Sequence, residues 1–245
     1  MKIQLFSDFH LENRDIVYPI PKADILILAG DVCQFDKLNS QRAFFMYLNL
    51  NWKKVIWILG NHEYYSKSTN LDVINTYIKG FISLFPNILI LDRNIIEIDN
   101  YRIMGCTLWS KISQNSEHLC TNAFKHMHID NRNITREEYN KMHSIDKQWL
   151  LNNYDPNRDT IIITHFPTKQ NFTVDPKYNN DSQDIKNVYT NDLYFKPNNK
   201  KLICLSGHTH YNFNKSVDGV KYRSNQYGNQ LEASTFYDTT GLIEF

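Results

Sequence analysis

The sequence predicts an α/β protein that folds as one domain. Short apolar runs rich in β-branched residues alternate with longer segments of helical spacing, which is typical of α/β folds. The chain has 245 residues, enough to bury one large hydrophobic core. The sequence contains no internal repeat and no linker rich in Gly, Ser or Pro. A single α/β domain spanning residues 1–245 is therefore the simplest expectation.

Eight apolar runs are the expected strands. Most contain Val or Ile, and several end in Gly, Asp, Asn or His, as buried strands do where they lead into a functional loop. They span residues 3–7, 25–28, 55–59, 88–91, 95–98, 102–105, 161–164 and 202–206. Near the C-terminus, the Asp218-Gly219 pair predicts the turn of a β-hairpin.

Three segments between these runs have the spacing of amphipathic helices. In the second, apolar residues recur at intervals of three and four from Leu71 to Phe85. The third opens with Thr135, and Glu138 follows three residues later, which is the pattern of a capping box. The expected helices span residues 40–49, 69–85 and 135–152.

Two polar stretches, at about residues 110–133 and 167–199, interrupt the alternation. Both are rich in Asn, Asp, Lys and aromatic residues, and both are too long for plain connections. We interpret them as insertions in the single domain that either shape a site or form partly mobile lids.

The composition excludes charge-driven binding to large polyanions. The chain is 42% hydrophobic and 22% charged, and its formal net charge is +1. It therefore lacks a global field that would attract nucleic acid or a membrane surface, although a local patch is compatible with this balance. No apolar run approaches the roughly 20 residues of a membrane helix, and the N-terminus lacks a cleavable signal pattern.

The cysteines predict a reducing environment. Cys33, Cys106, Cys120 and Cys204 have no CxxC spacing. Cys106 and Cys204 lie in apolar stretches, where a buried, reduced thiol is expected. We therefore expect a cytoplasmic location.

Five short motifs follow expected strands. They are Asp8-Phe9-His10, Gly30-Asp31, Gly60-Asn61-His62-Glu63, Thr164-His165 and Gly207-His208-Thr209-His210. Loops at the carboxyl ends of strands in an open α/β sheet converge on one rim, so these side chains should meet in one cleft. The glycines before Asp31, Asn61 and His208 suit sharp turns where side chains crowd the backbone.

The motif side chains form a ligand set for two metal ions. Carboxylate, imidazole and amide oxygen together suit Mn, Fe, Zn or Ni. A tetrahedral zinc site takes only four ligands. Two metals about 3.5–4 Å apart that share a carboxylate would use a larger number of ligands, as the candidate set requires. The candidate ligands are Asp8, His10, Asp31, Asn61, His165, His208 and His210. An ordinary polar or capping role explains any one of these residues, but not all seven at the ends of five strands.

The ordered motifs DFH, GD, GNHE, TH and GHTH resemble those of the calcineurin-like metallophosphoesterase superfamily over nearly the whole chain. The longer phrases LAGDV, GNHEYY, THFP and SGHTH resemble its small bacterial-type branch. A lone GD or GNH would be weak evidence, whereas the ordered set is specific. The resemblance implies a four-layer αββα sandwich of two mixed β-sheets flanked by helices, and a metal-dependent phosphoric ester hydrolase.

The resemblance also implies a role for each site residue. One metal would be held by Asp8, His10, Asp31 and His210. The second would be held by Asp31, Asn61, His165 and His208. Asp31 would bridge two divalent ions, with Mn expected and Fe, Zn or Ni as alternatives. The implied reaction is in-line attack on phosphorus by a metal-bridging hydroxide, and the catalytic His62 would supply a proton or positive charge to the leaving group.

Several neighbours of the motifs are candidates for supporting roles. Glu63 and Asp36 could orient an imidazole, or act as a loop cap or a solvated charge. Aromatic residues could line the cleft and bind substrate, or pack the insertions against the sheet: Tyr64, Tyr65, Trp109, Phe166 and Tyr211. Possible phosphate partners, or else surface cations, are Lys111, Lys169 and Arg223.

The sequence leaves four functions to compare. The first is hydrolysis of phosphodiesters or phosphomonoesters of small molecules or nucleotides. A nuclease of the same superfamily is less favoured, because nucleic-acid affinity rests on Lys and Arg contacts and the chain is nearly neutral. A non-catalytic interaction module is disfavoured because all candidate ligands and His62 are present. A protein phosphatase is disfavoured because the residues after Asp31 lack the Arg of GDxxDRG. Substrate, metal pair and oligomeric state stay open.

Overall fold

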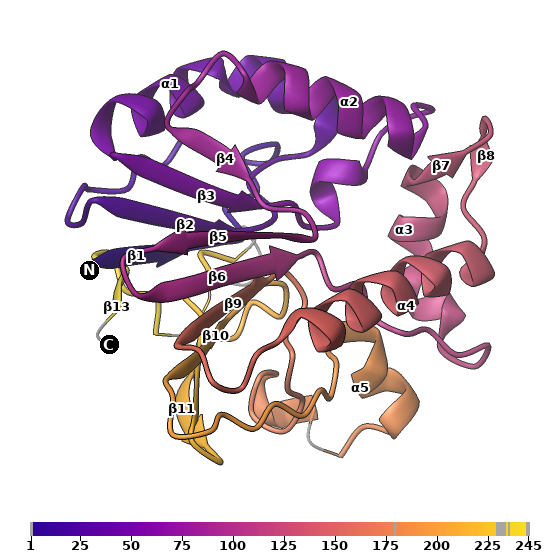
Figure 1. The fold of residues 1–245 in the computed structure, drawn as a ribbon. Helices are drawn as coiled ribbons and strands as arrows, with labels where there is room; N and C mark the ends of the chain where they lie inside the picture. The colour runs from indigo at the N-terminus through magenta and orange to yellow at the C-terminus, as the bar shows by residue number, and fades with distance from the viewer. Residues whose placement is uncertain (1, 179, 229–233, 235, 244–245) are drawn as a thin grey trace.

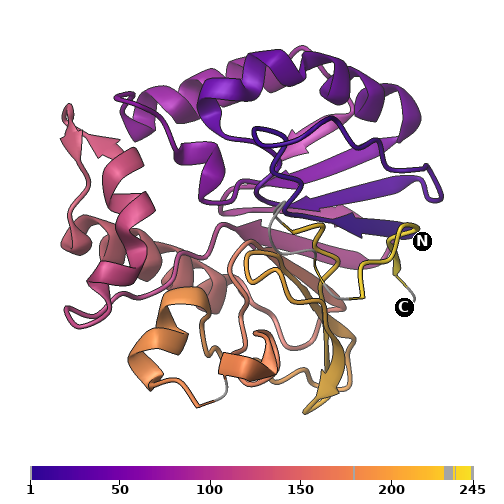
Figure 2. The ribbon, with the colours of Figure 1, turned by 180° about the vertical axis from the view of Figure 1, so that it is seen from behind.

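Two β-sheets stack face to face at the centre of the computed structural model, and helices cover their outer sides (Figure 1, Figure 2). The structure describes residues 2–178, 180–228, 234 and 236–243. In spatial order the first sheet contains β13 (Leu242–Ile243), β1 (Ile3–Phe6), β2 (Ile25–Ala29), β3 (Lys54–Ile58) and β4 (Ile88–Ile90). The second contains β11 (Asn214–Val217), β12 (Val220–Arg223), β10 (Leu202–Leu205), β9 (Thr160–Thr164), β6 (Tyr101–Cys106) and β5 (Asn94–Ile98). This is the expected α/β sandwich.

Both sheets are mixed, as expected. Strands β1 to β4 run parallel, and β13 pairs with β1 in the antiparallel direction. In the second sheet β6, β9, β10 and β12 run parallel, while β5 and β11 form antiparallel edges. The parallel strands bring their carboxyl ends to a common rim, where α/β proteins bind ligands.

All eight expected strands are present, and each end lies within one residue of its predicted position. Burial on both faces explains this agreement. In β2, Ile25 and Ile27 pack between the sheets, whereas Leu26 and Leu28 pack against the helices. A strand covered on both sides needs apolar residues at every position, so it stands out as a continuous run.

The three expected helices are also present. Helices α1 and α2 lie over the first sheet and α4 lies against the second (Figure 1). At the start of α4 the Thr135 side chain accepts the Glu138 N–H, and the Glu138 carboxylate accepts the Thr135 N–H, which completes the predicted capping box. Their bounds are α1 (Arg42–Asn51), α2 (Leu71–Ile82) and α4 (Arg136–Asn153).

Helix α2 ends three residues earlier than the apolar spacing predicts. Pro86 disfavours helical geometry at Phe85, so the chain leaves the helix before it. The predicted hairpin is formed by β11 and β12. Its turn residues Asp218 and Gly219 have positive φ of 51° and 78°, as a two-residue hairpin turn requires.

Both polar insertions contain short ordered elements. The segment 110–133 holds η3 (Glu117–Cys120), α3 (Thr121–His126) and the strand pair β7 (His128–Ile129) and β8 (Arg132–Asn133). The segment 167–199 holds η4 (Pro176–Tyr178) and α5 (Gln183–Tyr189). Further 3-10 turns, η1 (Phe35–Gln41) and η2 (His62–Tyr64), precede α1 and follow β3.

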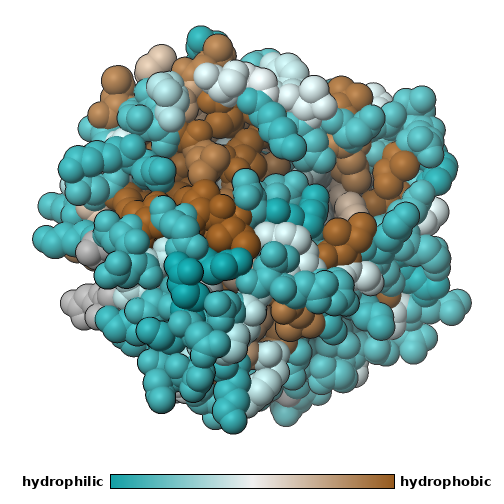
Figure 3. Space-filling view, in the orientation of Figure 1, coloured by the Kyte–Doolittle hydropathy of each residue, from teal (hydrophilic) through white to brown (hydrophobic). Residues whose placement is uncertain are grey.

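The outer surface is mostly polar on the face that Figure 3 shows. Hydrophobic side chains gather there over β4 and β5, the edge strands of the two sheets (Figure 3). Among the described helices, none combines the length and apolar character that a membrane span requires. The four cysteines are free thiols, and Cys106 and Cys204 are buried as expected.

Candidate metal centre

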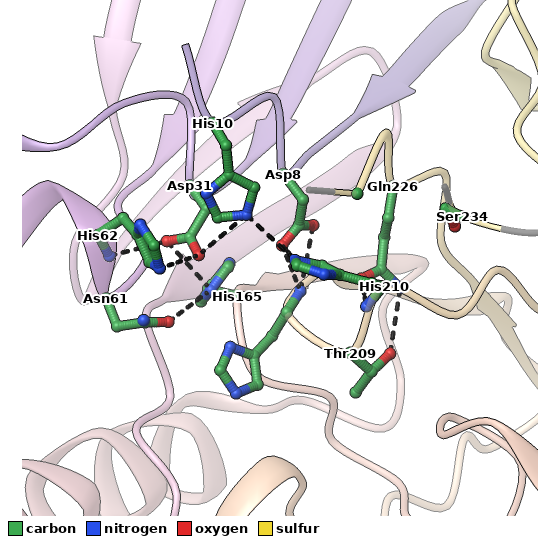
Figure 4. Close-up of polar contacts among 12 residues, drawn as sticks. Asp8, His10, Asp31, Asn61, His62, His165, Thr209, His210, Gln226 and Ser234 are labelled. Atoms are coloured by element: carbon green, nitrogen blue, oxygen red, sulfur yellow. Dashed lines mark hydrogen bonds and ion pairs between the residues drawn. The ribbon is translucent and has the colours of Figure 1, made fainter. Parts of the chain in front are cut away.

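The five motifs meet at one rim of the sandwich (Figure 4). Asp8 and His10 follow β1, Asp31 follows β2, and Asn61 and His62 follow β3. From the second sheet, His165 directly follows β9, and His208 and His210 follow β10. The predicted ligands therefore come from both sheets and face one another across the rim.

Three sets of side chains are close enough to hold a metal ion, with ligand atoms within 4.8 Å of one another. The first is Asp8, His10 and His210. The second is His10, Asp31 and His62. The third is Asp31, His165 and His208. The first and third sets coincide with three of the four ligands expected for each metal, and the second adds His62.

Asp31 lies between these sets. Its Oδ2 is 3.9 Å from Nε2 of His10, and its Oδ1 is 3.3 Å from Nε2 of His165. Oδ1 of Asn61 approaches the same Nε2 of His165, at 3.0 Å. The Asn61 amide is held in this orientation because its Nδ2 donates to the Tyr65 hydroxyl at 3.0 Å.

The donor set fits divalent cations. Nδ1 of His165 lies 2.8 Å from the Ala29 carbonyl, an acceptor that requires a hydrogen on Nδ1. In the neutral ring the Nε2 lone pair therefore points at the oxygens of Asp31 and Asn61. Nε2 of His10 and Nε2 of His210 are likewise only 3.1 Å apart. Converging lone pairs repel each other unless a proton or a metal lies among them, and imidazole with carboxylate is a common transition-metal set.

Burial and charge decide the protonation states here. Burial alone would raise the pKa of Asp31, but His165 and His62 hold it well below its ordinary value, so the carboxylate is ionised. Burial would lower the pKa of His165, but Asp31 raises it to about 9. For His208, burial and the charge of His165 both lower the pKa, which leaves a neutral imidazole. Metals bind ionised carboxylates and neutral imidazoles, so a metal ion would displace the proton that the raised pKa of His165 favours in the metal-free site.

The backbone is strained at five of the seven candidate ligands. Asp8, His10, Asp31, His208 and His210 have positive φ values of 55°, 47°, 52°, 74° and 52°. Such conformations are uncommon outside glycine and cost on the order of 1–3 kcal/mol each where the surroundings must enforce them. Four of the five lie at alternate positions, Asp8 with His10 and His208 with His210, and Phe9 between the first two is buried in the core.

The motif glycines make room for this crowding. A Cβ on Gly60 would collide with Oδ1 of Asp31, and a Cβ on Gly207 would lie 2.5 Å from Oδ2 of Asp8. No L-residue with a side chain fits at either position without displacing a candidate ligand.

Glu63 does not orient an imidazole, which corrects one of the two roles considered for it. Its buried carboxylate accepts backbone N–H groups from Asp31 at 3.0 Å, Val32 at 2.6 Å, Cys33 at 3.3 Å and Gly60 at 2.6 Å. It therefore ties the loop after β2 to the loop after β3. Asp36 does not orient an imidazole either, since its Oδ2 accepts the Lys67 N–H at 3.2 Å.

Two other residues contact the site and were missed by the sequence analysis. Oε1 of Glu12 lies 2.8 Å from Nδ1 of His62, and its position two residues after His10 was an available signal. Gln226, fully buried, accepts the His210 N–H at 2.6 Å and donates to Thr209 Oγ1 at 3.2 Å (Figure 4). No motif in the sequence pointed to Gln226.

Comparison with known proteins identifies the family. Residues 1–212 match the family described as calcineurin-like phosphoesterase. The chain belongs to this family. It is therefore a metal-dependent phosphoric ester hydrolase, and the resemblance in the motifs is confirmed.

Two relatives illustrate the family match. The chain is 30% identical to uncharacterized protein L509 of Acanthamoeba polyphaga mimivirus over 94% of this chain and 84% of that protein. Its fold is similar to the crystal structure of phosphopantetheinyl hydrolase from Mycobacterium tuberculosis, with a TM-score of 0.69 and 16% identity over 100% of this chain and 95% of that chain.

The aromatic neighbours of the phosphoesterase motifs divide into core and site residues. Tyr64 and Trp109 are 7% and 4% exposed and pack against each other in the core, with ring centroids 5.4 Å apart. This burial favours the packing role considered for them over contact with a substrate. Tyr65 is also buried, but its ring lies 4.8 Å from His62. Phe166 packs on His208 with centroids 3.8 Å apart.

The remaining candidates lie away from the phosphoesterase ligands or have other partners. Tyr211 and Arg223 line a cavity of about 620 Å³ beside the β11–β12 hairpin. Lys169 pairs with Asp192 at 2.6 Å, and Lys111 is exposed. None of these three cations forms a hydrogen bond or ion pair with a candidate metal ligand.

Proposed function

We propose that this chain is a binuclear metal-dependent phosphoesterase that hydrolyses phosphodiesters or phosphomonoesters of small molecules or nucleotides. The position of Asp31 between two donor sets carries the proposal, because one shared carboxylate is what a two-metal site needs. The proposed ligands of the first ion are Asp8, His10, Asp31 and His210. Those of the second are Asp31, Asn61, His165 and His208. Mn is the proposed metal, with Fe, Zn or Ni as alternatives.

Bound divalent ions would neutralise the phosphate oxygens and lower the pKa of a nearby water. The protein's own residues would align the phosphate for in-line displacement. Ligands from two sheets, held by the Glu63 and Gln226 contacts, form a rigid frame for this purpose.

His62 is the proposed proton donor to the leaving oxygen. Its side chain is 23% exposed, so a substrate can reach it, while its Nδ1 is held by Glu12. Burial lowers the pKa of His62, but in the metal-free site Asp31 and Glu12 raise it to about 9. A protonated imidazole beside the site is suited to general acid catalysis.

The two insertions are the proposed source of substrate selectivity within the single domain. In the insertion 110–133, the His126 ring lies 5.9 Å from Tyr65, which in turn contacts His62. In the insertion 167–199, the Tyr189 ring lies 6.3 Å from His208. Each insertion thus contributes a ring near the site, and rings there would suit a nucleobase or aryl group. We also propose a cytoplasmic location, which the free thiols favour.

A substrate panel with metal analysis tests the proposal. Purified protein reconstituted with Mn²⁺ is assayed with an aryl monoester, an aryl diester, cyclic nucleotides, a phosphopantetheinyl ester and single-stranded DNA. We expect two bound metals per chain, as the proposed binuclear site requires, and hydrolysis of at least one small ester. Fewer than one bound metal together with no hydrolysis would reject the enzyme assignment. Preference for the DNA would favour a nuclease.

A further inference from the structure

Glu12 contacts two histidines of the site through one carboxylate oxygen. Oε1 lies 3.2 Å from Nδ1 of His10 and 2.8 Å from Nδ1 of His62. The two rings meet edge to face with centroids 4.4 Å apart, and each presents Nε2 at 3.9 Å from Oδ2 of Asp31. Glu12 and Asp31 therefore lie at opposite ends of the same two imidazoles.

This contact selects one form of each ring. An ionised carboxylate only accepts hydrogen bonds, so the shared oxygen requires a hydrogen on Nδ1 of both His10 and His62. Nε2 is then the nitrogen of each ring that faces the cleft. The second Glu12 oxygen is an acceptor as well, because it receives the Gln34 N–H.

The carboxylate cannot easily turn away. The Glu12 side chain is 3% exposed, and its second oxygen accepts the Gln34 N–H at 3.2 Å. In the described part of the chain, no other carboxylate has a recorded contact with Nδ1 of either ring. Glu63 and Asp36, the candidates from the sequence, bind backbone N–H groups instead.

We propose that Glu12 is a positioning residue that holds His10 and His62 with Nδ1–H toward its carboxylate and Nε2 toward the cleft. The inference rests on the proposed function, in which His10 binds a metal and His62 protonates the leaving oxygen. In that step the Nε2–H bond of His62 breaks and an O–H bond forms on the leaving group. The neutral ring keeps its remaining hydrogen on Nδ1, where Glu12 holds it, ready to regain a proton at Nε2.

Glu12→Gln tests the proposal directly, because it keeps the shape of the side chain and changes only its charge and its hydrogen-bonding groups. The amide NH₂ of the glutamine must face either the Gln34 N–H or the two Nδ1–H groups. In both arrangements a hydrogen-bond donor faces another donor, so at least one hydrogen bond of Glu12 is lost. With metal content restored by excess Zn²⁺, we expect kcat for phenyl phosphate to fall about 10–100-fold. In a His62→Ala background the same change should cost less than about threefold, because the ring it positions is gone. The surface variant Glu97→Gln is the matched control and should leave kcat unchanged.

The ring nitrogens give a readout that does not depend on activity. In ¹⁵N-histidine NMR spectra of the Zn²⁺-loaded protein, the His62 signals are those that disappear in His62→Ala. We expect a His62 Nδ1–H signal in the wild type that shifts or broadens in Glu12→Gln. A wild-type ring protonated at Nε2 alone would overturn the proposal, as would an equal kcat loss in both backgrounds. If the wild type hydrolyses no ester, the proposed function fails, while the spectra still decide the role of Glu12.

Discussion

Nε2 of His165 lies 3.3 Å from Oδ1 of Asp31, and both side chains are almost completely buried. The pair joins the two sheets, since Asp31 follows β2 and His165 follows β9. Burial of a carboxylate at this depth is costly unless opposite charge surrounds it. Asp31 is therefore the residue on which the proposed metal centre depends most.

Asp31→Asn should remove both metals. The amide keeps the shape and an acceptor for the His62 N–H, which Oδ1 of Asp31 accepts at 2.9 Å, but it carries no charge and is a poor bridging ligand. We expect the metal content to fall from two ions per chain to below one, measured by elemental analysis after dialysis against metal-free buffer. Asp15→Asn, an exposed carboxylate, is the control and should retain both ions. A variant that keeps one tightly bound metal would argue that the two sites are independent.

Glu63→Gln should destabilise the loops that carry Asp31 and Asn61. Four backbone N–H groups converge on the Glu63 carboxylate, and an amide offers a single oxygen. Buried donors left without acceptors cost about 1–3 kcal/mol each. We expect the free energy of unfolding of the metal-free protein to fall by at least about 2 kcal/mol in urea titrations. Glu137→Gln, on the surface, is the control, and an equal loss in both variants would contradict the role of Glu63.

The sequence predicts the strands and the motif positions because each depends on local pattern. Runs such as 25–28 are buried on both faces, so their apolar character is continuous and unmistakable. Each motif lies within a few residues of a strand end, and strand ends in parallel sheets share a rim. The second sheet was available only through the family resemblance, and the order of the strands was not predicted.

Side-chain direction was not predictable from the sequence. Tyr64 and Tyr65 are adjacent beside the GNH motif, yet Tyr64 packs on Trp109 in the core while Tyr65 reaches His62. Gln226 contacts His210 across 16 residues, because β11 and β12 fold back on the sheet. Such contacts depend on tertiary packing, which residue spacing does not encode.

Gly60→Ala should abolish metal binding, whereas Gly80→Ala should stabilise the protein. A Cβ on Gly60 would collide with Oδ1 of Asp31 and lie 2.6 Å from its backbone nitrogen. A Cβ on Gly80, inside α2, has nothing within 4 Å, and alanine in a helix is favoured over glycine by about 0.5–1 kcal/mol. Metal titration and urea unfolding of the two variants check the pair. Full metal binding by Gly60→Ala would show that the loop can relax around the added carbon.

Asp146 lies outside the candidate metal centre and should make the free energy of unfolding depend on pH. Burial raises its pKa from 3.8 to about 6, although Arg93, at 2.6 Å, opposes the shift. The folded protein therefore binds more protons than the unfolded chain between these values, and the free energy of unfolding falls as pH rises through the window.

Asp146→Asn removes this titration, so its stability relative to the wild type should improve between pH 4 and pH 6 by on the order of 2 kcal/mol. Urea unfolding of metal-free protein at each pH measures the difference. Asp24→Asn, at an exposed ion pair with Lys53, is the control and should show no such trend. A constant difference across the window would mean that Asp146 titrates at its ordinary value.

Tyr189→Ala should weaken substrate recognition without affecting metals. The Tyr189 ring lies 6.3 Å from His208, at the end of α5, and is 39% exposed. Stacking of a base on an aromatic ring contributes about 1–3 kcal/mol, so kcat/KM for an aryl or nucleotide ester should fall on the order of tenfold. An alkyl ester should be affected less, because it offers no ring to stack. Tyr189→Phe keeps the ring and should retain the wild-type selectivity, with metal content equal in all three proteins. An equal loss for aryl and alkyl esters would mean that Tyr189 supports the fold of the insertion rather than the substrate.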